Sequence, residues 1–172
     1  MSALPDVYLA HGASGSAASM KPHVDGLLAR GVPARAVQLP RGTVERAIPV
    51  YVAAIGDDPA PVIGGHSFGG RVASLLAPDR EVRGLVLLSY PLHRPGGPET
   101  WDARTVHWKR IACPVLLLSG ESDPFARIPL LRKAAERLTQ AELVTYPGVG
   151  HGIGPVLDDA LDRISSFVRS LA

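Results

Sequence analysis

Short apolar runs recur along the chain at similar intervals and predict the strands of one sheet. Each run is apolar at successive positions rather than at alternate ones. Such runs are typical of parallel strands that are covered by helices on both faces. The runs are Val7–Ala10, Ala34–Leu39, Val62–Gly65, Gly84–Ser89, Val115–Ser119 and Glu142–Tyr146.

The segments between these runs carry apolar residues at the spacing of amphipathic helices. Alternating strands and helices predict a doubly wound α/β fold of about six parallel strands with helices on both faces. Residues 1–172 are expected to form a single domain. Pro49 is expected to interrupt or kink the second helix. The expected helices are 22–30, 43–55, the segment after Ser67, 128–138 and 155–171.

A glycine-rich turn follows the third apolar run and carries a G-x-S-x-G motif. Gly65 and Gly69 allow strand and helix to approach closely, and the strained turn between them exposes the hydroxyl of Ser67. Ser67 is therefore the candidate nucleophile, with a simple helix-capping serine as the alternative. A phosphate-binding loop is not supported, because Arg71 and Val72 occupy the positions where a lysine and a magnesium-binding hydroxyl are required.

Two further runs are followed by groups that complete a catalytic set. Asp123 follows the fifth run and His151 follows the sixth, so both are expected at the same sheet edge as Ser67. A serine hydroxyl needs a base such as imidazole, and the imidazole needs a carboxylate to orient it. Ser67, Asp123 and His151 are the candidate catalytic residues. Glu121 remains an alternative acid, and Asp123 is also compatible with a turn or helix-capping role.

The loop after the first run, His11–Gly15, is the candidate source of oxyanion stabilisation. A tetrahedral intermediate needs two backbone N–H donors aimed at its oxygen. One donor is expected from Phe68, which follows the nucleophile, and the other from Ala13, with the neighbouring Ser14 as the alternative. His11 is expected to be a structural histidine that bonds to nearby backbone.

Composition restricts the classes of function. The 172 residues are 46% hydrophobic and carry a net charge of +2 with dispersed basic residues, so nucleic-acid binding is not predicted. The one cysteine, Cys113, excludes an internal disulfide framework and a cysteine metal cluster, and it is interpreted as a structural thiol. Neither a signal peptide nor a membrane-spanning stretch is recognised, so a cytoplasmic protein is expected.

These motifs together resemble the α/β-hydrolase family. Within it, the chain is similar to the small dienelactone-hydrolase-like proteins and their testis-expressed and KANSL-type relatives. The resemblance implies Ser67, Asp123 and His151 as the triad, Ala13 and Phe68 as oxyanion donors, and a trimmed sheet of order 2-1-3-4-5-6. Dienelactone hydrolases proper use a cysteine nucleophile, so their substrate is not implied. The matching segments are 11–15, 65–71, 89–92, 119–125 and 148–151.

Many hydrolases of this kind carry a lid after the fourth strand, where this chain has only the segment Tyr90–Arg110. That segment is too short for a helical cap domain, which implies an open site for small acyl groups. Its histidines, His93 and His107, are expected to be surface or loop hydrogen-bonding residues. The candidate pocket residues are Ser14, Tyr90, Trp101 and Trp108. For Trp101 and Trp108, packing of this loop on the sheet edge is the alternative.

The predicted function is cleavage of carboxylic esters or thioesters of small acyl substrates through an acyl-enzyme on Ser67. No metal or organic cofactor is expected, and the predicted partner is a small-molecule acyl substrate. Two alternatives remain at this stage. One is a catalytically idle hydrolase fold that serves as a binding or scaffold protein. The other is a peptidase or amidase that uses the same triad.

Overall fold

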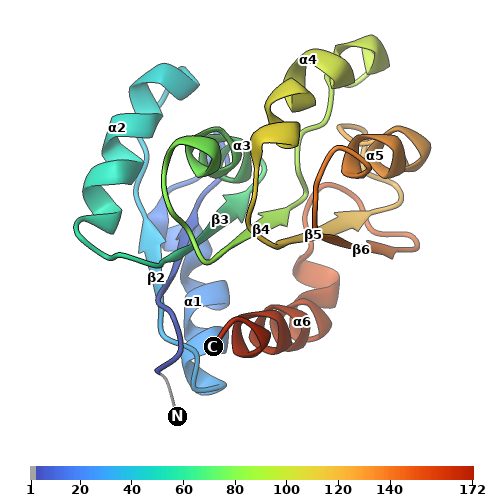
Figure 1. Ribbon diagram of the computed structural model, residues 1–172. Coiled ribbons are helices and arrows are strands. Elements are labelled where there is room, and N and C mark those ends of the chain that lie inside the picture. The colour runs from blue at the N-terminus through green and yellow to red at the C-terminus, as the bar shows by residue number, and fades with distance from the viewer. Residues whose placement is uncertain (1–2) are drawn as a thin grey trace.

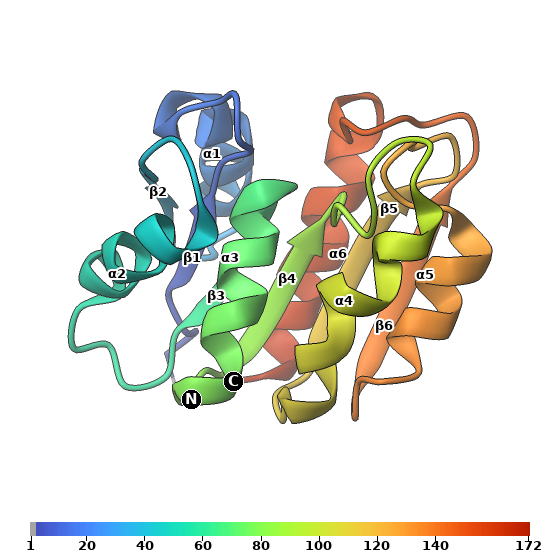
Figure 2. The ribbon, with the colours of Figure 1, turned by 90° about the horizontal axis from the view of Figure 1, so that it is seen from above.

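A sheet of six parallel strands forms the centre of the computed structural model, which describes residues 3–172 (Figure 1). The strand order is β2-β1-β3-β4-β5-β6, as predicted, and every neighbouring pair is parallel. Figure 2 shows the strands side by side from above. Their bounds are β1 Val7–Ala10, β2 Ala34–Val37, β3 Val62–His66, β4 Gly84–Leu88, β5 Val115–Gly120 and β6 Ala141–Tyr146.

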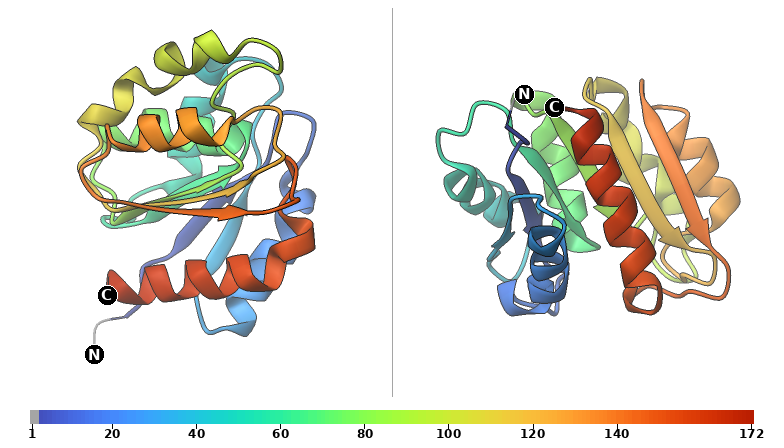
Figure 3. Two further views of the ribbon diagram at one scale, coloured as in Figure 1. Left: turned by 90° about the vertical axis from the view of Figure 1, so that its right-hand side faces the viewer. Right: turned by 90° about the horizontal axis from the view of Figure 1, so that it is seen from below.

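Helices cover both faces of the sheet, as the left view in Figure 3 shows. On one face lie α1 (Lys21–Ala29) and α6 (Leu157–Ser170), which contact each other. The opposite face is covered by α2 (Val44–Ile55), α3 (Phe68–Leu76), α4 (Trp101–Thr105) and α5 (Ile128–Ala135) (Figure 1). None of the helices within residues 3–172 is long and apolar enough to cross a membrane.

The central strands are apolar at successive positions because each of their faces has its own hydrophobic cluster. In β1, Val7 and Leu9 pack into the cluster under α1 and α6, whereas Tyr8 and Ala10 pack into the cluster under α2 and α3. All four residues are buried. This two-sided burial explains why the sequence shows continuous apolar runs instead of an alternating pattern.

The connection from β3 to α3 packs directly against β1, and glycine makes this possible. A Cβ atom at Gly65 would lie 2.4 Å from the carbonyl oxygen of Ala10, and a Cβ at Gly69 would lie 2.4 Å from the same oxygen. Real Cβ atoms essentially never come so close to backbone, so any side chain here requires strand and helix to separate. The two motif glycines therefore fix the position of the residue between them.

The helices differ from the sequence prediction in three places. The helix α5 ends at Ala135 instead of at residue 138. The helix α2 runs without interruption through Pro49, which lies at an exposed position in its second turn, so an interruption there was wrong. The carbonyl that loses its partner is that of Glu45, which is also exposed and therefore open to water. In the C-terminal region, a 3₁₀ turn over Gly154–Val156 precedes α6, so the expected single helix has two parts.

A buried polar pair joins α3 to the segment after α4. The Nε2 atom of His107 lies 2.9 Å from the Oγ atom of Ser74, and both residues are buried, which corrects the expectation of a surface or loop position for His107. Burial, together with the charges of Arg71 and Arg110, lowers the pKa of His107 to about 4. The imidazole is therefore neutral in the folded protein at neutral pH.

Acidification is expected to destabilise the fold through His107. Between pH 6.5 and 4 the unfolded chain binds a proton that the folded state resists, so stability falls as the pH falls. His107→Gln, which keeps a hydrogen-bonding group but does not titrate, should therefore reduce the loss between pH 7 and pH 5 by about 2 kcal/mol. Urea unfolding of both proteins at the two pH values measures this difference. An equal loss in both proteins would contradict the assignment.

Candidate active site

Ser67 lies at the turn between β3 and α3, at the carboxyl edge of the sheet. Its backbone has φ 50° and ψ −118°, a left-handed conformation that is strained for a residue with a side chain. The backbone N–H of Ser67 donates to the carbonyl oxygen of Leu88 at 2.8 Å, which ties the turn to β4. This geometry matches the strained strand-to-helix turn that the G-x-S-x-G spacing predicts.

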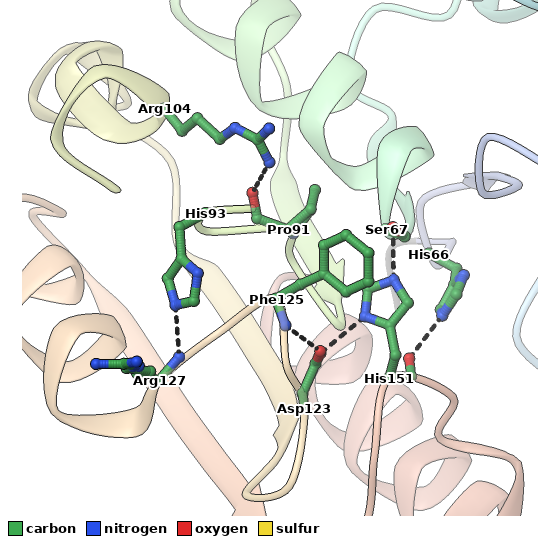
Figure 4. A network of polar contacts seen from close by, with 9 residues as sticks. All are labelled: His66, Ser67, Pro91, His93, Arg104, Asp123, Phe125, Arg127 and His151. Carbon is green, nitrogen blue, oxygen red and sulfur yellow. Dashed lines mark hydrogen bonds and ion pairs between the residues drawn. The ribbon is translucent and has the colours of Figure 1, made fainter. Parts of the chain in front are cut away.

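The three predicted catalytic side chains form a continuous hydrogen-bonded chain (Figure 4). The Nε2 atom of His151 lies 2.8 Å from the Oγ atom of Ser67, and its Nδ1 atom lies 2.8 Å from the Oδ2 atom of Asp123. A carboxylate only accepts, so Nδ1 carries the proton and Nε2 of the neutral ring accepts from the serine hydroxyl. The arrangement is therefore suited to taking a proton from Ser67.

The loop after β5 brings Asp123, and not Glu121, to the histidine. The side chain of Asp123 is fully buried, and its Oδ1 atom accepts the backbone N–H of Phe125 at 2.8 Å. Asp123 thus closes a turn with one oxygen and contacts His151 with the other. Glu121 is exposed and accepts from the hydroxyl of Thr145.

Two residues that the sequence analysis did not assign to the site support this loop. The ring of Phe125 packs against the ring of His151, with centroids 4.3 Å apart. His93 is buried, its backbone N–H donates to the carbonyl of Phe125 at 3.0 Å, and its Nε2 atom accepts the N–H of Arg127 at 3.0 Å (Figure 4). The loop position and the hydrogen bonding expected of His93 are therefore confirmed, whereas a surface position is excluded by its burial.

A cavity of about 540 Å³ opens beside the serine. Ala13 and Ser14 are the central residues of a turn in its wall, closed by a 3.0 Å hydrogen bond from the N–H of Gly15 to the carbonyl of Gly12. Phe68 is the first residue of α3, and an N–H at that position has no intrahelical acceptor. The residues that line the cavity are Gly12, Ala13, Ser14, Gly15, Ser19, His66, Ser67, Phe125 and His151.

Of the four candidate pocket residues, Ser14 alone lines this cavity. Tyr90 and Trp108 are buried in the core, where their rings meet edge to face at 4.9 Å. Trp101 lies beside a separate apolar pocket, and the guanidinium of Arg137 stands 4.5 Å from its ring centre. The aromatic residues after β4 therefore pack onto the helical layer instead of over Ser67, which corrects the prediction for these three residues.

His11 has the structural role that the sequence predicts. Its Nε2 atom accepts the backbone N–H of Leu39 at 2.9 Å, and its Nδ1 atom lies 2.7 Å from the carbonyl oxygen of Gly12. It thereby connects the cavity-lining turn to the chain after β2. Among residues 3–172, no three His, Cys, Asp or Glu side chains are grouped so that they could hold a metal ion.

Comparison with solved structures gives high similarity over nearly the whole chain. The monoacylglycerol lipase of Paleococcus ferrophilus has a TM-score of 0.85 at 18% identity, covering 98% of this chain and 96% of that one. Est1E from Butyrivibrio proteoclasticus has a TM-score of 0.80 at 17% identity, covering 98% and 88%. The dienelactone hydrolase of Anabaena variabilis has a TM-score of 0.80 at 19% identity, covering 98% and 87%.

At these identities the structural similarity establishes the fold. The sequence itself matches the family described as alpha/beta hydrolase domain over residues 29–161, a span that includes all three members of the hydrogen-bonded chain. Because this match extends over most of the sequence and agrees with the observed strand order, the protein belongs to the alpha/beta hydrolase domain family.

Proposed function

We propose that the protein is a serine hydrolase that cleaves carboxylic ester or thioester bonds of small acyl substrates. The observation that carries this proposal is the unbroken contact from Asp123 through His151 to Ser67, with both hydrogen bonds at 2.8 Å. A hydroxyl on a strained turn, an imidazole in contact with it and a buried carboxylate behind the imidazole are the parts that acyl transfer requires. A binding protein has no physical need for all three.

In the proposed acylation step, the Oγ atom of Ser67 attacks the carbonyl carbon while the Nε2 atom of His151 takes the hydroxyl proton. The buried carboxylate of Asp123 stabilises the imidazolium that forms. The oxyanion of the tetrahedral intermediate accepts hydrogen bonds from the backbone N–H groups of Phe68 and Ala13. Collapse breaks the bond to the leaving group, which takes the proton from His151 and departs as an alcohol or a thiol.

Deacylation repeats the same proton transfers with water as the nucleophile. His151 takes a proton from water, the resulting hydroxide attacks the acyl carbon, and the proton then returns to the Oγ atom of Ser67. The products are a carboxylic acid and the free enzyme. The residues of this chain thus supply the nucleophile, the base and the charge stabilisation.

The shape of the site supports small acyl substrates. The cavity beside Ser67 holds about 540 Å³, and its lining includes the small residues of the segment 12–15. The segment after β4 packs onto the core through Tyr90 and Trp108 and contributes no residue to the lining of this cavity. A short acyl group therefore has direct access to the serine.

Covalent labelling tests the proposal. A fluorophosphonate probe is expected to label the folded protein, because the activated serine attacks phosphorus as it attacks a carbonyl carbon. Ser67→Ala should abolish labelling without loss of folding, whereas Ser74→Ala, which alters a buried serine of α3, should retain it. Labelled protein is detected by its mass. Folded protein that takes up no probe, or Ser67→Ala protein that still does, would favour the scaffold alternative.

A further inference from the structure

We propose that His66 is a positioning residue that holds the catalytic histidine against the nucleophile. This inference rests on the proposed function, because it assigns to His66 a role in orienting His151. The side chain of His66 does not belong to the triad, and 85 positions of the sequence separate it from His151. It nevertheless bonds directly to the backbone of that residue (Figure 4).

The geometry fixes which nitrogen of His66 carries the proton. Its Nε2 atom lies 2.9 Å from the backbone carbonyl oxygen of His151, and the two ring centroids are 5.2 Å apart. A carbonyl oxygen only accepts hydrogen bonds, so Nε2 must be the donor. In the neutral ring this leaves Nδ1 unprotonated, and that atom faces Gly12, where an added Cβ would lie 3.1 Å from it.

The loop that carries His151 needs such a restraint. Gly150 and Gly152 flank the histidine, and a Cβ at either position would meet no atom within 4 Å. Glycines in open space lose much conformational freedom when a loop is held in one conformation. The preceding Val149 is tied to the loop after β5, since its carbonyl accepts the N–H of Ser122 at 2.9 Å. The bond from His66 restrains the loop at His151 itself.

The position of His66 in the chain makes this bond effective. It is the last residue of β3 and stands directly before Ser67. The end of β3 therefore holds both the nucleophile and the backbone of its base. Any displacement of the loop that lengthens the contact between His151 and the serine hydroxyl must also break or bend the bond from His66.

The charge state of His66 suits this role. Burial lowers the pKa of His66, and the nearby His151 lowers it further, against the opposing effects of the backbone hydrogen bond and Asp123. The neutral ring of His66 is therefore favoured at neutral pH. A cationic neighbour at this distance would oppose the positive charge that His151 acquires in the reaction.

The kinetics of two His66 variants distinguish a role in positioning His151 from a role in packing alone. His66→Leu removes the donor, and kcat for a short-chain ester is expected to fall about 10- to 100-fold with little change in KM. His66→Gln retains an N–H near the position of Nε2 and is expected to recover most of the lost kcat. Urea unfolding of each variant shows whether it is folded. Full activity in folded His66→Leu protein would overturn the proposal.

A measurement on the unaltered protein needs no variant. Long-range ¹H–¹⁵N spectra of the histidine rings are expected to show His66 as the Nε2–H tautomer, and a Nδ1–H tautomer would overturn the proposal. These outcomes are separate from those of the proposed function. Absence of labelling at Ser67 refutes the hydrolase, whereas labelling and turnover that are unaffected by His66→Leu refute the positioning role alone.

Discussion

Replacing Asp123 with asparagine is expected to lower kcat for a short-chain ester about 10⁴-fold while leaving the fold intact. The Oδ1 atom of asparagine can still accept the N–H of Phe125, so the turn is retained. The amide NH₂ then faces Nδ1 of His151 and donates to it, which moves the ring proton to Nε2. An Nε2–H group cannot accept the proton of Ser67, so the loss comes from the wrong tautomer.

Steady-state kinetics with matched controls test this prediction. Ser67→Ala should lower kcat by about 10⁶-fold, and adding Asp123→Asn to it should cause little further loss, because residues that act as a unit are not additive. Glu121→Gln changes an exposed carboxylate in the same loop and should retain activity within about twofold. A normal rate for Asp123→Asn, or a large loss for Glu121→Gln, would contradict the assignment of the acid.

The sequence predicts the sheet and the polar contacts of the candidate site because both depend on local signals. Apolar runs at successive positions identify buried parallel strands, and parallel strands with right-handed crossovers place the segments after β3, β5 and β6 at one edge. Ser67, Asp123 and His151 are the groups at these strand ends that can relay a proton. The local motifs identify these side chains, and the topology brings them into contact.

The aromatic residues and the supporting histidines depend on long-range packing and were harder to predict. Nothing in the sequence near Trp108 distinguishes a residue that lines a pocket from one that packs against Tyr90 in the core. The role of Phe125 depends on the position of the loop that brings the ring of His151 into contact with it. His66 could have been noticed because it stands next to the nucleophile, but its partner is a backbone carbonyl 85 residues away.

Substituting Gly120 with alanine is expected to lower both stability and activity. This glycine lies where the loop that carries Asp123 contacts the loop that carries His151. A Cβ atom at the end of β5 would stand 2.1 Å from the carbonyl oxygen of Val149 and 2.4 Å from that of Gly150. Backbone atoms cannot rotate away as a flexible side chain would, so the loop that carries His151 must move. We expect the free energy of unfolding to fall by about 3 kcal/mol.

The same displacement separates His151 from its partners, and kcat should fall about 10²-fold or more even where the variant is folded. Gly152→Ala is the matched control, since a Cβ there meets no atom within 4 Å although the residue adjoins His151. Urea unfolding and ester hydrolysis measured on both variants distinguish close backbone contact from general sensitivity of the loop. If the two substitutions have equal effects, the approach of β5 to this loop does not set the catalytic geometry. If Gly120→Ala alone is impaired, glycine is required at position 120 by the close approach of two backbone segments. That approach brings the carboxylate of Asp123 to the imidazole of His151.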